Sequence, residues 1–136
     1  MNECVFCGIL SGNIPAHFVY KDDLVVAFLS LEQPNPYKVL VVSRAHVETV
    51  YDLSDEQAAA IFKVTVKIAR GVRGVSKCEG MNLVQSNGRA GQQDVFHFHL
   101  HIVPRFSGDG IVLDWDNTAA PPETLNQYAR EIQENL

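Results

Sequence analysis

The stretch that decides the fold is His97-Phe98-His99-Leu100-His101-Ile102-Val103-Pro104, in which histidines alternate with apolar residues. Successive side chains of a β-strand point to opposite faces, so the pattern predicts a strand with Phe98, Leu100 and Ile102 facing the core. The histidines then form a row on the other face, with neighbours roughly 6.5–7 Å apart. The chain has 5 histidines in all. Three in strict alternation therefore favour chemistry over a merely solvated strand face.

A row of imidazoles supports two kinds of chemistry. Neutral imidazole is a good metal ligand, so the row can hold a catalytic metal. Alternatively, one imidazole attacks an electrophile while its neighbours orient it and donate protons. The residues alone leave both readings open.

Apolar segments on both sides of this row predict further strands. They are separated by polar turns or by turns that contain Gly or Pro. The segments expected in the sheet, the histidine strand included, are 19–20, 25–29, 39–42, 81–85 and 96–103.

The helices have equally clear signals. Ser54-Asp55-Glu56-Gln57 has the form of a capping box, and Gly71 and Gly74 predict the end of the long helix that follows. Residues 4–10 predict a short N-terminal helix, and 125–136 a C-terminal one. We therefore expect an α+β fold, an antiparallel sheet of about five strands with one long helix and two shorter ones. The apolar face expected on the long helix is Ala58, Ile61, Val64, Ile68 and Val72.

Composition excludes several classes of protein. The 136 residues suit one domain spanning 1–136, with weaker patterning after about 107. A net charge of −5 argues against a general nucleic-acid binder. No apolar run approaches the ~20 residues needed to span a membrane, and Met1-Asn2-Glu3 begins no secretory signal. With 3 cysteines, a disulfide scaffold is not expected, and we predict a cytoplasmic protein.

The histidine row and its surroundings resemble the histidine triad family of nucleotide hydrolases and transferases. The pattern His-φ-His-φ-His-φ-φ, with φ apolar, is that family's signature, and the likeness runs from Cys4 to about Arg105. An N-terminal Cys-x-x-Cys is typical of many bacterial members. The resemblance implies the family's fold and, as is usual there, a homodimer. The other matching positions are Ile14-Pro15, Tyr20, Ala27-Phe28, Leu40-Val41-Val42, His46, Asn87-Gly88 and Pro104-Arg105.

The resemblance also implies a mechanism. The catalytic residues would be His97, His99 and His101, with His99 attacking the α-phosphorus of a purine nucleotide conjugate. Water would then cleave the nucleotidyl-imidazole, and no organic cofactor is needed. Nucleoside phosphoramidates and dinucleoside polyphosphates are the implied substrates. The implied nucleotide-binding residues are Phe6, Ile9, Phe28, Ser30, Leu31, Asn87, Gln93 and Asp94.

Cys4 and Cys7 are two thiols at zinc-knuckle spacing. On the residues alone, two thiols without a metal and a redox disulfide compete with a metal site. In related proteins with this pair, zinc is held by the two cysteines and two histidines. The resemblance therefore implies a structural zinc site made of Cys4, Cys7, His46 and His97.

Three positions depart from the family pattern. Ser30 stands where an acid often binds the ribose hydroxyls, with Glu32 as a nearby substitute. Asp94 stands where Ser or Thr commonly donates to phosphate. Tyr37-Lys38 replaces a frequent Gly-His. Because an ionised Asp94 repels phosphate, it must point away, be protonated or favour a leaving group that bears nitrogen.

Two other functions fit the same residues. The first is a metalloenzyme that uses the histidine row as its metal site, in which case metal loss abolishes turnover. The second is a non-catalytic nucleotide-binding or scaffold protein, in which case nucleotide binds tightly with slow turnover. An intact His99 argues against the second, since a pure binder needs no nucleophile.

Overall fold

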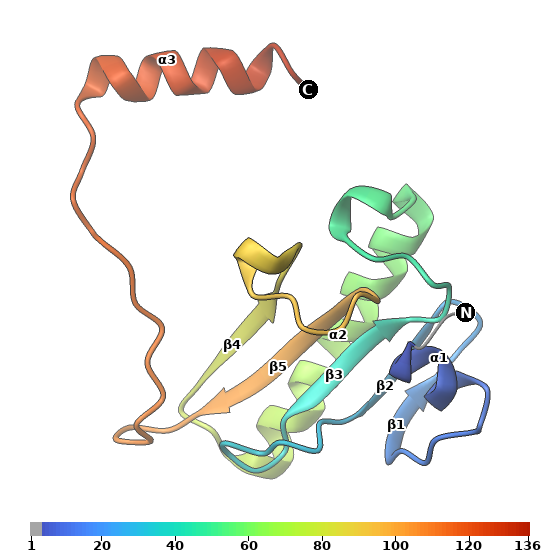
Figure 1. The fold of residues 1–136 in the computed structure, drawn as a ribbon. Helices are drawn as coiled ribbons and strands as arrows, with labels where there is room; N and C mark the ends of the chain where they lie inside the picture. The colour runs from blue at the N-terminus through green and yellow to red at the C-terminus, as the bar shows by residue number, and fades with distance from the viewer. Residues whose placement is uncertain (1–3) are drawn as a thin grey trace.

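The computed structural model describes residues 4–136, and residues 1–3, where no secretory signal is expected, lie outside the described part (Figure 1). A five-stranded antiparallel sheet has the order β1-β2-β3-β5-β4. The α+β prediction is thus confirmed. The strands are β1 (Phe18–Lys21), β2 (Val25–Leu29), β3 (Val39–Ser43), β4 (Gly80–Gln85) and β5 (His99–Arg105). The helices are α1 (Val5–Leu10), α2 (Asp55–Ser76) and α3 (Pro122–Gln133), with single 3-10 turns at Val50–Asp52 and Arg89–Gly91.

The histidine strand lies inside the sheet, between β3 and β4. Its first paired residue is His99, opposite Val42, so the expected strand at 96–103 begins three residues too early. The reason is local: the Phe98 amide donates to the Val47 carbonyl at 2.7 Å, in the loop after β3. His97 is therefore held beside that loop, just before the ladder begins.

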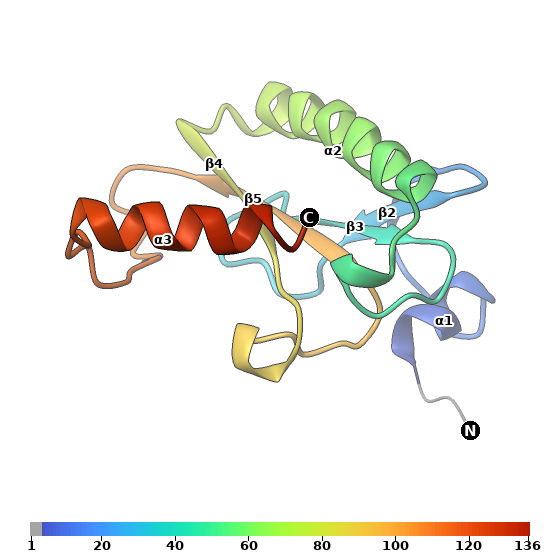
Figure 2. The same ribbon diagram turned by 90° about the horizontal axis from the view of Figure 1, so that it is seen from above.

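The sheet is covered on both faces, which explains the unbroken apolar runs of β2 and β3. On one face Phe98, Leu100 and Ile102 pack with α2, which confirms the predicted alternation. On the other face Phe6 and Ile9 of α1 pack on Val26, Phe28, Leu40 and Val42. Figure 2 shows α2 and α1 on opposite sides of the strands. The second face is also the one that carries the histidines.

Helix α2 begins as predicted and ends later. Ser54 Oγ accepts from the Gln57 amide at 3.1 Å, and Gln57 Oε1 accepts from the Ser54 amide at 2.9 Å. The helix continues past Gly71 and Gly74 and ends at Lys77, whose φ is 58°. Glycine costs about 1 kcal/mol relative to alanine inside a helix, and burial of Val72 against the sheet offsets that cost.

The inward face of α2 follows the predicted spacing with one change. Ala58 is exposed, and Ala60 packs against the core instead. The buried residues of the helix are Ile61, Val64, Thr65 and Val72.

The chain after β5 leaves the sheet as an arm. Figure 1 shows α3 standing away from the sheet at the end of an extended segment. No residue of α3 is buried, and its apolar Leu125, Tyr128 and Ile132 are exposed. At the base of the arm Arg105 Nε donates to Asp109 Oδ2 at 2.8 Å. Within residues 4–136, no helix is both long and apolar enough to cross a bilayer.

Candidate active site and metal centre

His99 is held in one tautomer by the main chain. Its Nδ1 donates to the carbonyl oxygen of His97 at 2.8 Å, and the side chain is only 5% exposed. With the proton on Nδ1, the lone pair is on Nε2. Asp94 Oδ1 lies 3.6 Å from that Nε2. The ring is thus oriented with Nε2 beside an exposed carboxylate.

A cavity of about 260 Å³ opens beside His99 and His101. We call it the apolar cavity, because most of the residues that line it are apolar. The ring of Phe6 stands edge-on to both Phe28 and His99, with centroids 5.6 and 5.0 Å apart. Its wall includes the expected Phe6, Ile9, Phe28, Ser30, Leu31 and Asp94, as well as Glu32 and Lys38.

Two features of this wall differ from expectation. Leu31 is 90% exposed, so it forms the rim of the cavity and no inner wall. Ala16 and Val95 also line the cavity, although the sequence analysis did not predict them as wall residues. Both are small apolar residues in loops, where periodicity gives no signal.

The second cavity histidine is neutral in the folded protein. Burial, together with the nearby Lys38 ammonium, lowers the pKa of His101 to about 4. The rings of His99 and His101 are 5.0 Å apart. At neutral pH His101 therefore offers one N–H donor and one lone pair to whatever enters the cavity.

Asn87 and Gln93 do not line the apolar cavity. Asn87 Oδ1 accepts from the Val50 amide at 2.7 Å. Gln93 is buried, and its Nε2 donates to the Glu48 carbonyl at 2.7 Å. The Gly88 amide donates to Gln93 Oε1 at 2.8 Å. In this arrangement both side chains fix the loop that presents Asp94.

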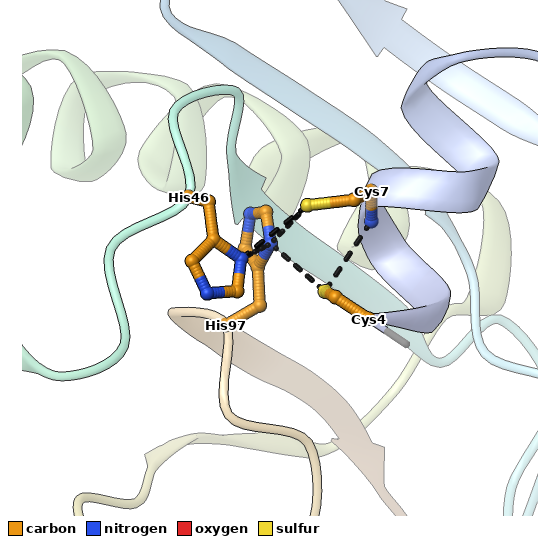
Figure 3. A group of neighbouring side chains, drawn as sticks. All are labelled: Cys4, Cys7, His46 and His97. Atoms are coloured by element: carbon orange, nitrogen blue, oxygen red, sulfur yellow. Dashed lines mark hydrogen bonds between the residues drawn. The ribbon is translucent and has the colours of Figure 1, made fainter. Parts of the chain in front are cut away.

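The side chain of His97, the first histidine of the row, does not line the apolar cavity. His97, with no exposed surface, lies with Cys4, Cys7 and His46, which we call the Cys–His group (Figure 3). The cysteines come from α1 and the residue that caps it, and His46 comes from the loop after β3. Their four ligand atoms lie within 4.8 Å of one another.

The distances within this group suit a tetrahedral metal ion. His46 Nδ1 and His97 Nδ1 are 3.2 Å apart, and each is 3.3 Å from one sulfur, Cys7 and Cys4 respectively. Ligands at about 2.3 Å for sulfur and 2.0–2.1 Å for nitrogen would lie roughly 3.3–3.8 Å apart in a tetrahedron. The donor set therefore fits a metal.

The protonation of His97 fits the same conclusion. Its Nε2 donates to the Ser43 carbonyl at 2.7 Å, which leaves the lone pair on Nδ1, facing the sulfurs. Burial lowers the pKa of His97 and keeps the ring neutral. Among the described residues, this is the one group of His, Cys, Asp and Glu whose donor atoms converge so closely, and neither His99 nor His101 belongs to it.

Comparison with known proteins gives consistent matches. The HIT domain model matches residues 11–108. The Bacillus subtilis protein hit is 39% identical over 98% of this chain and 94% of its own length. A crystal structure of a HIT family member from Bacillus subtilis has a TM-score of 0.95 at 38% identity, covering 99% of this chain and 98% of that one.

Two further matches bear on chemistry. The adenosine 5'-monophosphoramidase hnt1 of Schizosaccharomyces pombe is 30% identical, over 98% of each chain. The crystal structure of a Zn-bound histidine triad family protein from Mycobacterium smegmatis has a TM-score of 0.76 at 34% identity, covering 85% of this chain and 84% of that one.

Proposed function

Because the chain belongs to the HIT family, we propose that it is a nucleotide-binding hydrolase or transferase that cleaves purine nucleotide conjugates at the α-phosphate through His99. One observation carries the proposal: a buried imidazole has Nδ1 fixed on a carbonyl and Nε2 beside an apolar cavity. The S. pombe relative, an adenosine 5'-monophosphoramidase by name, supports phosphoramidates as the substrate class.

The first step is attack by His99 Nε2 on the α-phosphorus. A bond forms between that nitrogen and phosphorus while the bond from phosphorus to the leaving group breaks. The base fills the apolar cavity and packs against Phe6 and Phe28, and Ser30 and Glu32 face the ribose. In the second step water attacks phosphorus and releases the monophosphate.

His101 and His97 support this chemistry in different ways. His101 donates a hydrogen bond to the phosphate oxygens, and the negative charge of bound phosphate raises its pKa again, so that it can carry a proton. His97 orients His99 through its carbonyl oxygen. Asn87 and Gln93 act on the nucleotide through the loop that they hold.

We propose that the Cys–His group holds a structural zinc ion. Four protein ligands leave no open position, so the metal would supply folding energy rather than a reactive water. The group ties Cys4 and Cys7 of the α1 segment to His46 and His97. Since Phe6 lies between the two cysteines in sequence, the metal would hold the cavity wall in place.

The family resemblance supports a homodimer. β4 is an edge strand, and it carries the exposed Leu83 next to a cavity lined by Val66 and Met81. The exposed stripe of α3 is a second apolar surface available to a partner copy. We propose the whole chain, 1–136, as one unit of that dimer.

The test is turnover of a fluorogenic adenosine phosphoramidate by the wild-type protein and by His99→Ala, each with and without a zinc chelator. We expect turnover that His99→Ala lowers by about 10⁴-fold or more, and that brief chelation leaves largely intact. The matched control is His17→Ala, an exposed histidine outside the cavity.

Other outcomes select other functions. Turnover lost on chelation and restored by metal would favour the metalloenzyme. Inactivity on this substrate and on diadenosine tetraphosphate, with nucleotide still bound, would favour a binding or scaffold protein.

A further inference from the structure

We propose that Asp94 selects conjugates whose leaving group is a positively charged amine, and disfavours polyphosphate leaving groups. This inference rests on the proposed function and adds the chemistry of the leaving group. It begins from the short distance between Asp94 Oδ1 and His99 Nε2, 3.6 Å. That distance excludes the expected alternative in which Asp94 points away from the nucleophile.

A second cavity, of about 360 Å³, adjoins the apolar cavity. The two cavities share the wall residues Val5, Asp94 and Val95. When the base and ribose fill the apolar cavity and phosphorus faces His99, the rest of the conjugate can extend past Asp94 into this second cavity. We call it the leaving-group cavity.

The two cavities differ in charge. The leaving-group cavity has two carboxylates, Asp94 and Glu48, and among the described residues that line it none is Lys or Arg. The apolar cavity has Lys38 in its wall, together with the carboxylates of Glu32 and the shared Asp94. Lys38 thus suits the nucleotide phosphate, whereas Asp94 and Glu48 suit a cation. Asp94 is 74% exposed, so solvent weakens but does not cancel this field.

When a phosphoramidate is cleaved, positive charge develops on the leaving nitrogen. The P–N bond breaks as the bond from His99 Nε2 to phosphorus forms. The electron pair goes to nitrogen, which takes a proton from solvent and leaves as an amine. Water then cleaves the phosphohistidine and returns that proton. A carboxylate beside the nitrogen stabilises its developing positive charge, whereas it repels a departing polyphosphate.

The experiment compares three adenosine phosphoramidates of similar length, made with 1,3-diaminopropane, butylamine and β-alanine. They present an ammonium, a methyl and a carboxylate group respectively. For each, kcat/KM is measured with the wild type, Asp94→Asn and Asp94→Ser. Comparing ratios between variants cancels the intrinsic reactivity of each leaving amine.

We expect the wild type to prefer the ammonium over the carboxylate conjugate, and Asp94→Asn to reduce that ratio by about five- to tenfold. Raising the salt concentration should reduce the wild-type ratio in the same direction. The matched control is Asp23→Asn, which removes the same charge from an exposed position between β1 and β2 and should leave the ratio unchanged.

The outcomes are separable. Turnover with equal ratios in the wild type and Asp94→Asn would overturn this inference and leave the proposed function standing. A ratio changed as much by Asp23→Asn would show an effect of net charge and would also overturn it. Absence of turnover on all three conjugates would overturn the proposed function and this inference with it.

Discussion

The two ends of the histidine row have opposite environments. At the end that includes His97, imidazole and thiol atoms converge on a common point, and the side chain has no exposed surface. At the end that includes His99 and His101, the nitrogens face an open cavity. The first arrangement could close a coordination shell around a metal ion, whereas the second leaves room for a small molecule.

Under the proposed function, neighbouring residues of one type divide structure and chemistry between them. His97 and His99 are two residues apart, and a single hydrogen bond from Nδ1 to the His97 carbonyl joins their sites. If the division is correct, changes at the Cys–His group should affect stability more than the chemical step. Changes at the cavity should do the reverse.

The largest effect is expected from Cys7→Ala. Loss of one of four ligands should release the metal and lower the free energy of unfolding by about 3–5 kcal/mol, since metal binding contributes to folding. Metal content and chemical denaturation measure this. The control is Cys78→Ala, a half-buried cysteine outside the group. Unchanged metal content in Cys7→Ala would contradict the proposal that the Cys–His group holds the metal.

A smaller effect is expected at the cavity end as the pH falls. The pKa of His101 is about 4 in the folded protein, against 6.5 for an ordinary histidine, so the unfolded chain takes up the proton first as the pH falls. Protonation of the unfolded chain lowers the free energy of unfolding. The contribution of His101 to that free energy is therefore fully present above pH 6.5 and is lost as the pH falls toward 4. Between pH 7 and 5 the wild type should lose about 1–2 kcal/mol more than His101→Gln.

Acid should release the metal from the wild type and from His101→Gln alike. Its effect on the free energy of unfolding therefore cancels when the two proteins are compared. Equal losses in urea denaturation at the two pH values would contradict the assignment of this pKa shift to His101.

The smallest effect is expected where the two ends meet, at Phe6. Its ring stands edge-on to His97 at 5.8 Å and to His99 at 5.0 Å. Phe6→Leu keeps an apolar wall but loses these ring contacts, worth about 1 kcal/mol. KM should rise roughly fivefold, with kcat changed less than twofold and metal content unchanged. Phe62→Leu, at an exposed position on α2, is the control; an equal rise in KM there would contradict the prediction.

Much of the fold was predictable, because its signals are local. Alternation placed Phe98, Leu100 and Ile102 in the core, and the capping box at Ser54 marked the start of α2. The missed boundaries have tertiary causes. Gly71 stays helical because the neighbouring Val72 is buried, and β5 starts at His99 because Phe98 bonds to the loop after β3.

The sequence predicted which residues meet in the Cys–His group and several of those that line the apolar cavity, but it did not predict the directions of the side chains. The roles of these residues stay a prediction. The separation of His97 from His99 and His101 depends on where β5 begins, and the inward hydrogen bonds of Asn87 and Gln93 depend on contacts distant in sequence. Tyr37 is a related case. Its φ is 74°, a left-handed conformation that suits the glycine frequent there in the family and costs a tyrosine about 1–2 kcal/mol.

The hydrogen bond from His99 to the His97 carbonyl has a consequence for genetics. The acceptor is a main-chain atom, so every residue type at position 97 retains it. An alanine scan would therefore attribute to His97 only the contribution of its imidazole, and would miss the carbonyl that accepts from His99 Nδ1. Chemical synthesis could reach that atom: an ester in place of the amide between His97 and Phe98 would weaken the carbonyl as an acceptor. It would also remove the Phe98 N–H that donates to the Val47 carbonyl, so the matched control is Val47 with its own carbonyl weakened by an ester between Val47 and Glu48.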